Sequence, residues 1–80
     1  MKELMIIPAY NEEKNILNTI NSIKKYNKIK LDYIVINDGS TDNTQKVLKE
    51  NKINFINLYN NLGIGGAVQT GYKYAYKNNY

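Results

Sequence analysis

Three side chains with the chemistry to bind a nucleobase stand just beyond apolar segments of the sequence. They are Tyr10 and Glu12 in the stretch IIPAYNEEKNI, and Asp38 in the stretch INDGSTD. A flat tyrosine ring can stack on a base. A carboxylate accepts hydrogen bonds, so Asp38 can pair with the imide N–H of uracil or with the ring N–H and amino group of guanine. Glu12 can accept from a base or a ribose in the same way. We therefore expect these three residues to contact a ligand.

The neighbours of Tyr10 and Glu12 have simpler structural explanations. Pro8 lacks a backbone N–H, so we expect it to end the first strand. Asn11 is a favoured N-cap residue, and Glu13 places a negative charge in the first helical turn, where the helix dipole favours it. A turn and a cap thus explain Asn11 and Glu13, but they give no reason for an aromatic ring at position 10.

The segment that begins at Asp38 also has residues that favour a turn. Gly39 tolerates a positive φ, and Ser40 or Thr41 can cap the helix that follows. Turn formation explains Asp38 least, because its carboxylate stands at the tip of a predicted strand. Ligand contact and turn formation are the two alternative roles for Asp38.

A glycine-rich segment, NLGIGGA, precedes the third predicted helix. Glycines allow a backbone to approach a ligand closely, and the N–H groups of a helix start favour anions. The segment is not the dinucleotide-binding fingerprint, because Val68 stands in place of its last glycine, and it lacks the Gly-Lys-Ser/Thr of a P-loop. Close packing of the helix on the sheet explains Gly71.

The elements that must position these residues alternate along the chain. Short, β-branched apolar runs typical of strands covered on both faces occupy residues 3–8, 31–37 and 53–59. A helical pattern follows each run: Ile16, Ile20, Ile23 and Tyr26 on one helix face, then Val47 and Leu48, then Ala67, Val68, Gly71, Tyr72 and Ala75. This order predicts an α/β fold, a Rossmann-like three-layer βαβαβα arrangement with a small parallel sheet. Ligands of such sheets bind at the carboxyl ends of the strands, which is where all three loops lie.

Size and composition limit the alternatives. The 80 residues make one marginal domain, residues 1–80, without cysteine or histidine for a disulfide or zinc site. Three strands leave unpaired sheet edges, so we expect a partial domain that self-associates or is completed by a missing C-terminal part.

The net charge of +4 comes from lysine without arginine, which argues against nucleic-acid binding. No apolar run is long enough to span a membrane and no signal peptide opens the chain. The expected location is cytoplasmic, with any membrane association left to the full-length protein.

The segments IIPAYNEEKNI, DYIVINDGSTDNT and NLGIGGAVQTGYKYA, in this order and spacing, resemble family 2 glycosyltransferases with the GT-A fold. The nearest resemblance is to the branch that includes dolichol-phosphate mannosyltransferase-like enzymes and bacterial polysaccharide-building enzymes. It covers essentially the whole chain and implies the N-terminal portion of a GT-A fold. It also implies transfer of a sugar, with inversion, from a nucleotide-sugar donor (a UDP- or GDP-sugar). The acceptor is unknown and would be a saccharide or a polyprenyl phosphate.

The resemblance also implies which residues bind the nucleotide. The Pro-Ala-Tyr-Asn-Glu segment wraps the nucleoside, the Asp-Gly-Ser segment contacts the base, and the small-residue helix start lies nearby. Carried over to this sequence, these are Pro8, Ala9, Tyr10, Glu12, Asp38, Gly39, Gly65, Gly66 and Ala67.

Two features of the family are missing from the sequence. Leu62, Ile64 and Val68 occupy positions where many relatives carry Lys or Arg, and no Asp-x-Asp metal motif occurs. The divalent cation expected for the complete enzyme, Mg²⁺ or Mn²⁺, is thus predicted to find no ligands in this chain, and no residue is assigned to catalysis. We expect nucleoside recognition without sugar transfer. The alternative is a non-catalytic nucleotide-binding or regulatory module derived from such an enzyme. A receiver-like signalling domain fits less well, because no acidic pair follows the first strand.

Overall fold

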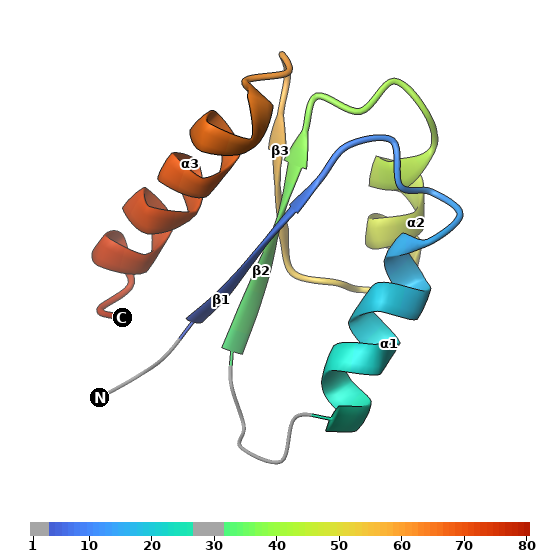
Figure 1. Ribbon diagram of the computed structural model, residues 1–80, viewed down its shortest axis with the longest axis horizontal. Helices are drawn as coiled ribbons and strands as arrows, with labels where there is room; N and C mark the ends of the chain where they lie inside the picture. The colour runs from blue at the N-terminus through green and yellow to red at the C-terminus, as the bar shows by residue number, and fades with distance from the viewer. Residues whose placement is uncertain (1–3, 27–31) are drawn as a thin grey trace.

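The computed structural model describes residues 4–26 and 32–80, the side chain of Tyr26 excepted, and these residues form three layers (Figure 1). Strands and helices alternate in the order β1 (Leu4–Ala9), α1 (Ile16–Tyr26), β2 (Asp32–Asp38), α2 (Thr44–Glu50), β3 (Phe55–Leu58) and α3 (Gly63–Lys77). The predicted α/β class and βαβαβα order are confirmed. The expected strand residues 3 and 31, and the expected packing of the Tyr26 side chain, lie outside the described residues. None of the described helices is both long and apolar enough to cross a membrane.

The sheet is parallel, with β2 between β1 and β3. Ile34 of β2 lies opposite Ile6 of β1, and Ile36 of β2 lies opposite Ile56 of β3. Ile34, Val35 and Ile36 are at most 1% exposed, because β2 is central in the sheet and is covered by helices on both faces. Burial on both faces is the physical reason for the unbroken apolar run in this strand.

The helices divide between the two faces of the sheet, with α1 and α2 on one side and α3 on the other (Figure 1). Ile16, Ile20 and Leu48 form the core of the first side with Val35, whereas Ala67 packs with Ile34 and Ile36 on the second. This division follows from right-handed crossovers, which place α1 and α2 on the same face as the chain steps from β1 to β3.

At Gly71, α3 lies close against the sheet. A Cβ atom added there would lie 2.4 Å from Cγ2 of Ile6, so only glycine fits without a shift of that side chain. The predicted packing role of Gly71 is thereby confirmed.

The ends of two strands differ from the prediction. Pro8 does not end β1, which continues to Ala9, with Pro8 opposite Ile36. Proline is tolerated here because, within the described sheet, β1 is an edge strand paired only with β2. The third strand is shorter than residues 53–59 and comprises Phe55–Leu58.

Candidate functional site

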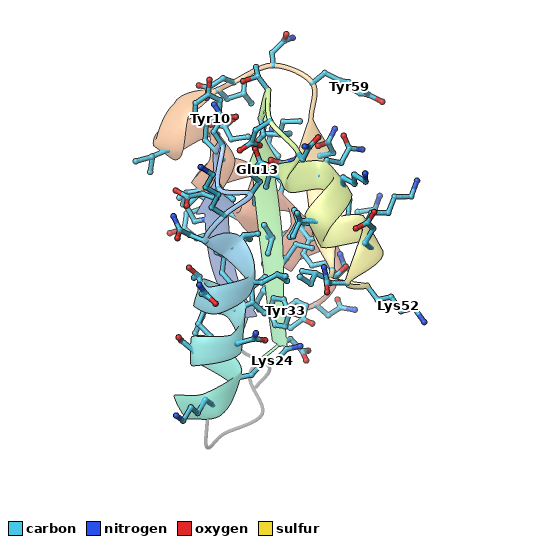
Figure 2. All side chains as sticks on the ribbon, turned by 90° about the vertical axis from the view of Figure 1, so that its right-hand side faces the viewer. Tyr10, Glu13, Lys24, Tyr33, Lys52 and Tyr59 are labelled. Atoms are coloured by element: carbon cyan, nitrogen blue, oxygen red, sulfur yellow. The ribbon has the colours of Figure 1, made fainter. Side chains whose placement is uncertain are left out.

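Three loops meet where the parallel strands end. They follow Ala9, Asp38 and Leu58, the last residues of β1, β2 and β3. Figure 2 shows Tyr10 and Tyr59 at this end of the sheet, while Tyr33 and Lys52 lie toward the opposite end. The sheet therefore gathers residues that are about 50 positions apart in sequence, as expected for the carboxyl edge of a parallel sheet.

A cavity of about 220 Å³ opens between the first loop, the end of β2 and the start of α3. Its lining residues are Pro8, Ala9, Tyr10, Glu12, Asp38 and Ile64. All of them except Ile64 were predicted from the sequence to surround a nucleoside. Tyr10 is 46% exposed, so its ring keeps area for a ligand to cover.

Asp38 connects the second loop to the third. The side chain is 4% exposed, and its Oδ1 accepts a hydrogen bond of 2.7 Å from the backbone N–H of Leu62. Asn61 donates from Nδ2 to the backbone carbonyl of Asp38 (3.2 Å). Among the described residues, nothing donates a hydrogen bond to Oδ2 of Asp38. Asp38 therefore has both a structural role and an acceptor oxygen left for a ligand, which were the two alternatives drawn from the sequence.

Gly39 allows the second and third loops to touch. Its φ is +66°, and a Cβ atom there would lie 2.5 Å from the backbone nitrogen of Asn61. Because that neighbour is backbone, no side-chain rotation could relieve the clash. Gly39 thus shapes the floor of the site without being one of the cavity-lining residues.

The start of α3 supplies one unexpected residue. Ile64 lines the cavity although it is 76% exposed. Its sequence signals were an apolar side chain among glycines and a position where the resemblance would place Lys or Arg. Gly65, Gly66 and Ala67 are not among the lining residues. Gly65 faces open space, Gly66 packs beside the Cβ of Leu62, and Ala67 is fully buried against the sheet. The structure therefore places these three residues next to the cavity and not in its wall.

Asn11 does not cap α1, so that prediction is wrong. The helix begins at Ile16, and Asn11 adopts a left-handed conformation with φ of 52°. Its Oδ1 instead accepts from the backbone N–H of Thr41 (2.8 Å), the Thr41 hydroxyl (3.3 Å) and the backbone N–H of Asp42 (3.3 Å). Asparagine tolerates this conformation better than most residues. The side chain that resembled a cap joins two loops instead.

The prediction that Ser40 or Thr41 caps the second helix is also wrong. The helix begins at Thr44, and its first N–H donates to Oδ1 of Asp42 (2.9 Å). Asp42 Oδ2 also accepts from the backbone N–H of Glu13 (3.3 Å). Desolvation, the largest single contribution, raises the pKa of Asp42, but hydrogen bonds from Thr44 and Glu13 outweigh it and hold that pKa below its usual value. Asp42 is therefore ionised at neutral pH, and its stabilising contribution falls only as the pH drops through the lowered pKa.

A second cavity, of about 380 Å³, lies at the opposite end of the sheet. Its lining residues are Asp32, Tyr33, Lys52, Asn54 and Tyr80. The hydroxyl of Tyr80 donates to Oδ2 of Asp32 (2.6 Å), and this hydrogen bond is the main reason that the pKa of Tyr80 rises to about 12. Despite its volume, this cavity is the weaker candidate for a ligand site, because it lies at the amino ends of the strands, away from the edge where such sheets bind ligands.

The described residues contain no cluster of three or more acidic side chains placed to hold a metal ion. Two acidic residues, Glu12 and Asp38, line the cavity, and one oxygen of Asp38 is committed to the Leu62 N–H. These residues therefore do not form a site that fits the divalent cation implied by the resemblance.

Comparison with known proteins shows the family to which the chain belongs. The family model described as glycosyl transferase family 2 matches residues 5–79. The chain belongs to glycosyltransferase family 2. The layered βαβαβα architecture agrees with the N-terminal part of a GT-A fold.

Several curated relatives of this family 2 chain carry names of sugar-transferring enzymes. A UDP-N-acetylglucosamine–dolichyl-phosphate N-acetylglucosaminyltransferase of Methanococcus voltae is 40% identical, over 91% of this chain and 35% of that protein. A poly-β-1,6-N-acetyl-D-glucosamine synthase of Staphylococcus epidermidis is 34% identical, over 88% of this chain and 18% of that protein. The chain thus spans about a third or less of the length of these relatives.

Proposed function

We propose that the cavity at the end of β1 and β2 binds the nucleoside of a nucleotide-sugar donor for a family 2 glycosyltransferase. The main observation behind this proposal is that Tyr10, Glu12 and Asp38 line one cavity, where one carboxylate oxygen of Asp38 receives no hydrogen bond from the described residues. An aromatic face and a free acceptor are the two features that recognise a base with a ring N–H. Membership of the family supports a sugar nucleotide over other nucleotides.

In this role, each residue has a defined task. Tyr10 stacks on the base, the free oxygen of Asp38 accepts its N–H, and Glu12 accepts from the base or the ribose. Pro8 and Ala9 form the wall beside the ring. Gly65 leaves the backbone of α3 open to the donor, whereas Gly66 and Ala67 act through packing, Gly66 beside Leu62 and Ala67 against the sheet.

The reaction proposed for the complete enzyme is transfer of the sugar with inversion. The acceptor oxygen attacks the anomeric carbon from the side opposite the nucleoside diphosphate, a C–O bond forms, and the diphosphate leaves with the bonding electrons. The acceptor is a saccharide or a polyprenyl phosphate, in keeping with the names of the relatives. A base must take the proton when the acceptor is a saccharide hydroxyl, whereas the oxygen of a polyprenyl phosphate is already ionised at neutral pH. A divalent cation, Mg²⁺ or Mn²⁺, would aid departure of the diphosphate. Both would have to come from residues other than those described.

For the 80 residues themselves we propose binding without transfer. Titration calorimetry with UDP, GDP and ATP tests this, because adenine has an acceptor where uracil and guanine have a ring N–H. Tighter binding of UDP or GDP than of ATP is the expected result. Equal affinity for all three would remove base recognition by Asp38 from the proposal.

Replacing Tyr10 with alanine is expected to weaken UDP or GDP binding by about 1–3 kcal/mol, because the stacking face is lost. Tyr10→Phe keeps that face and serves as the matched control, with binding close to that of the wild type. Calorimetry measures both variants, and thermal unfolding checks that each remains folded. If Tyr10→Ala is folded and binds as well as the wild type, Tyr10 makes no stacking contact.

We also propose that the isolated chain self-associates or needs further chain to complete its sheet. In the described residues, β1 and β3 each pair on one side only, and Tyr72 and Tyr76 of α3 are 65% and 89% exposed. Unpaired edges and exposed rings are surfaces that favour association. Sedimentation velocity should therefore show dimers or larger species at tens of micromolar protein. A well-folded monomer throughout that concentration range would contradict this expectation.

A further inference from the structure

We infer that Asn11 is a positioning residue for the nucleotide site, which it serves by fixing the loop that carries Tyr10 and Glu12. This role rests on the proposed nucleotide binding, and it concerns a residue that makes no contact with the ligand itself. Asn11 lies between the two cavity-lining residues in sequence but is not part of the lining.

The side chain of Asn11 accepts hydrogen bonds from the neighbouring loop. Its Oδ1 accepts from two successive backbone N–H groups, those of Thr41 and Asp42, and from the hydroxyl of Thr41. The residues joined are 30 and 31 positions apart in sequence, so these bonds tie the end of β1 to the segment after β2. Only a residue with an acceptor that also tolerates φ of 52° can make this connection.

The backbone of Asn11 is anchored from a different direction. Its N–H donates to Oγ of Ser40 (3.0 Å), and that hydroxyl in turn donates to Oδ1 of Asn37. Asn37 is 1% exposed and donates from Nδ2 to Oδ1 of Asn57 in β3 (2.8 Å). A continuous line of hydrogen bonds therefore runs from β3 through buried Asn37 to the loop beside the cavity.

Contacts on both sides of Asn11 leave the intervening backbone little freedom. Ala9 is held in β1, opposite Asn37, and the N–H of Glu12 donates to Oγ1 of Thr44 (2.9 Å). Tyr10 thus lies between a paired strand residue and the anchored Asn11. A loop fixed before the ligand arrives binds more tightly, because ordering it upon binding costs free energy.

Three variants separate the acceptor of Asn11 from its backbone conformation. Asn11→Asp keeps both the acceptor and the tolerance of positive φ, and should bind UDP or GDP like the wild type. Asn11→Gly keeps the conformation but removes the acceptor, and should bind about tenfold more weakly. Ser40→Ala removes the anchor of the Asn11 N–H together with the hydrogen bond to Asn37, but it keeps the Oδ1 contacts of Asn11. It should therefore give a smaller loss of affinity, and it serves as a second test if Asn11→Gly does not fold.

The matched control for stability is Ile53→Val, a buried change on the α1 and α2 side of the core. It should lower the melting temperature while leaving nucleotide affinity unchanged, so lost affinity in Asn11→Gly cannot be ascribed to lower stability alone. Calorimetric affinity and melting temperature are measured for every variant. If wild type binds and folded Asn11→Gly binds equally well, the positioning role is wrong and the proposed function stands. If wild type binds neither UDP nor GDP, both are wrong.

Discussion

Replacing Asp38 with asparagine is expected to weaken UDP or GDP binding by about 10- to 100-fold while the protein stays folded, since a hydrogen bond to a charged group contributes about 1.5–3 kcal/mol. Asparagine has the same shape, so its Oδ1 can still accept from the Leu62 N–H, as Asp38 does at 2.7 Å. The free carboxylate oxygen, however, becomes an amide NH₂. A donor would then face the N–H of the base, and the attraction would turn into a clash of donors.

Asp38→Ala separates the two roles of the residue. It removes the acceptor for the base and also leaves the Leu62 N–H without its partner, which costs about 1–3 kcal/mol of folding stability. We therefore expect Asp38→Ala to lose both nucleotide affinity and thermal stability, and Asp38→Asn to lose affinity alone. Calorimetry and thermal unfolding of the two variants provide the comparison. Wild-type affinity in Asp38→Asn would show that the base is recognised elsewhere.

Gly39→Ala is expected to have the largest effect on stability. The left-handed conformation costs a residue with a Cβ about 1–2 kcal/mol, and here the Cβ also meets backbone atoms of Asn60 and Asn61 at 2.7 and 2.5 Å. The third loop would have to move, and with it the Leu62 N–H that Asp38 holds. Since small domains are stable by only about 0.05–0.15 kcal/mol per residue, this change removes much of the total.

Two other glycines serve as controls that separate the cost of the left-handed conformation from the cost of the steric clash. Gly63 also has a positive φ, of +79°, but no atom of the described residues lies within 4 Å of an added Cβ, so Gly63→Ala shows the conformational cost alone. Gly65 lies in α3 with open space around it, and Gly65→Ala should stabilise the helix by up to about 1 kcal/mol. The expected order of melting temperatures is Gly65→Ala highest, then Gly63→Ala, then Gly39→Ala. If Gly39→Ala and Gly63→Ala melt together, the close approach of the two loops is not a real constraint.

The residues that line the cavity, except Ile64, could be predicted because they follow or end strands of a parallel sheet. Parallel strands end at one edge of the sheet, so the tyrosine and the carboxylates that follow β1 and β2 had to come together there. The unbroken apolar run of β2 likewise indicated a central strand buried on both faces. In these cases the local sequence pattern and the tertiary structure require the same residue types at the same positions.

The roles of Asn11, Ser40 and Thr41 were predicted wrongly because their hydrogen-bond partners are distant in the sequence. Asn11 precedes a helix and has the side chain of a cap, but it binds backbone groups 30 and 31 residues away. In the same way, Ser40 and Thr41 form hydrogen bonds with Asn11 and do not cap α2, whose first N–H donates to Oδ1 of Asp42. Local spacing encodes which groups can accept a hydrogen bond. It does not encode which loop will present the donors.

The most direct test of the proposed function is an NMR titration of the ¹⁵N-labelled protein with UDP and with GDP. Binding in the cavity should shift the backbone amides of Tyr10, Glu12 and Leu62, because these residues line it or share a hydrogen bond with Asp38. The amides of Lys52 and Asn54, in the cavity at the opposite end, should stay in place. Shifts confined to that opposite cavity, or no shifts with either nucleotide, would contradict the nucleoside site proposed for this chain.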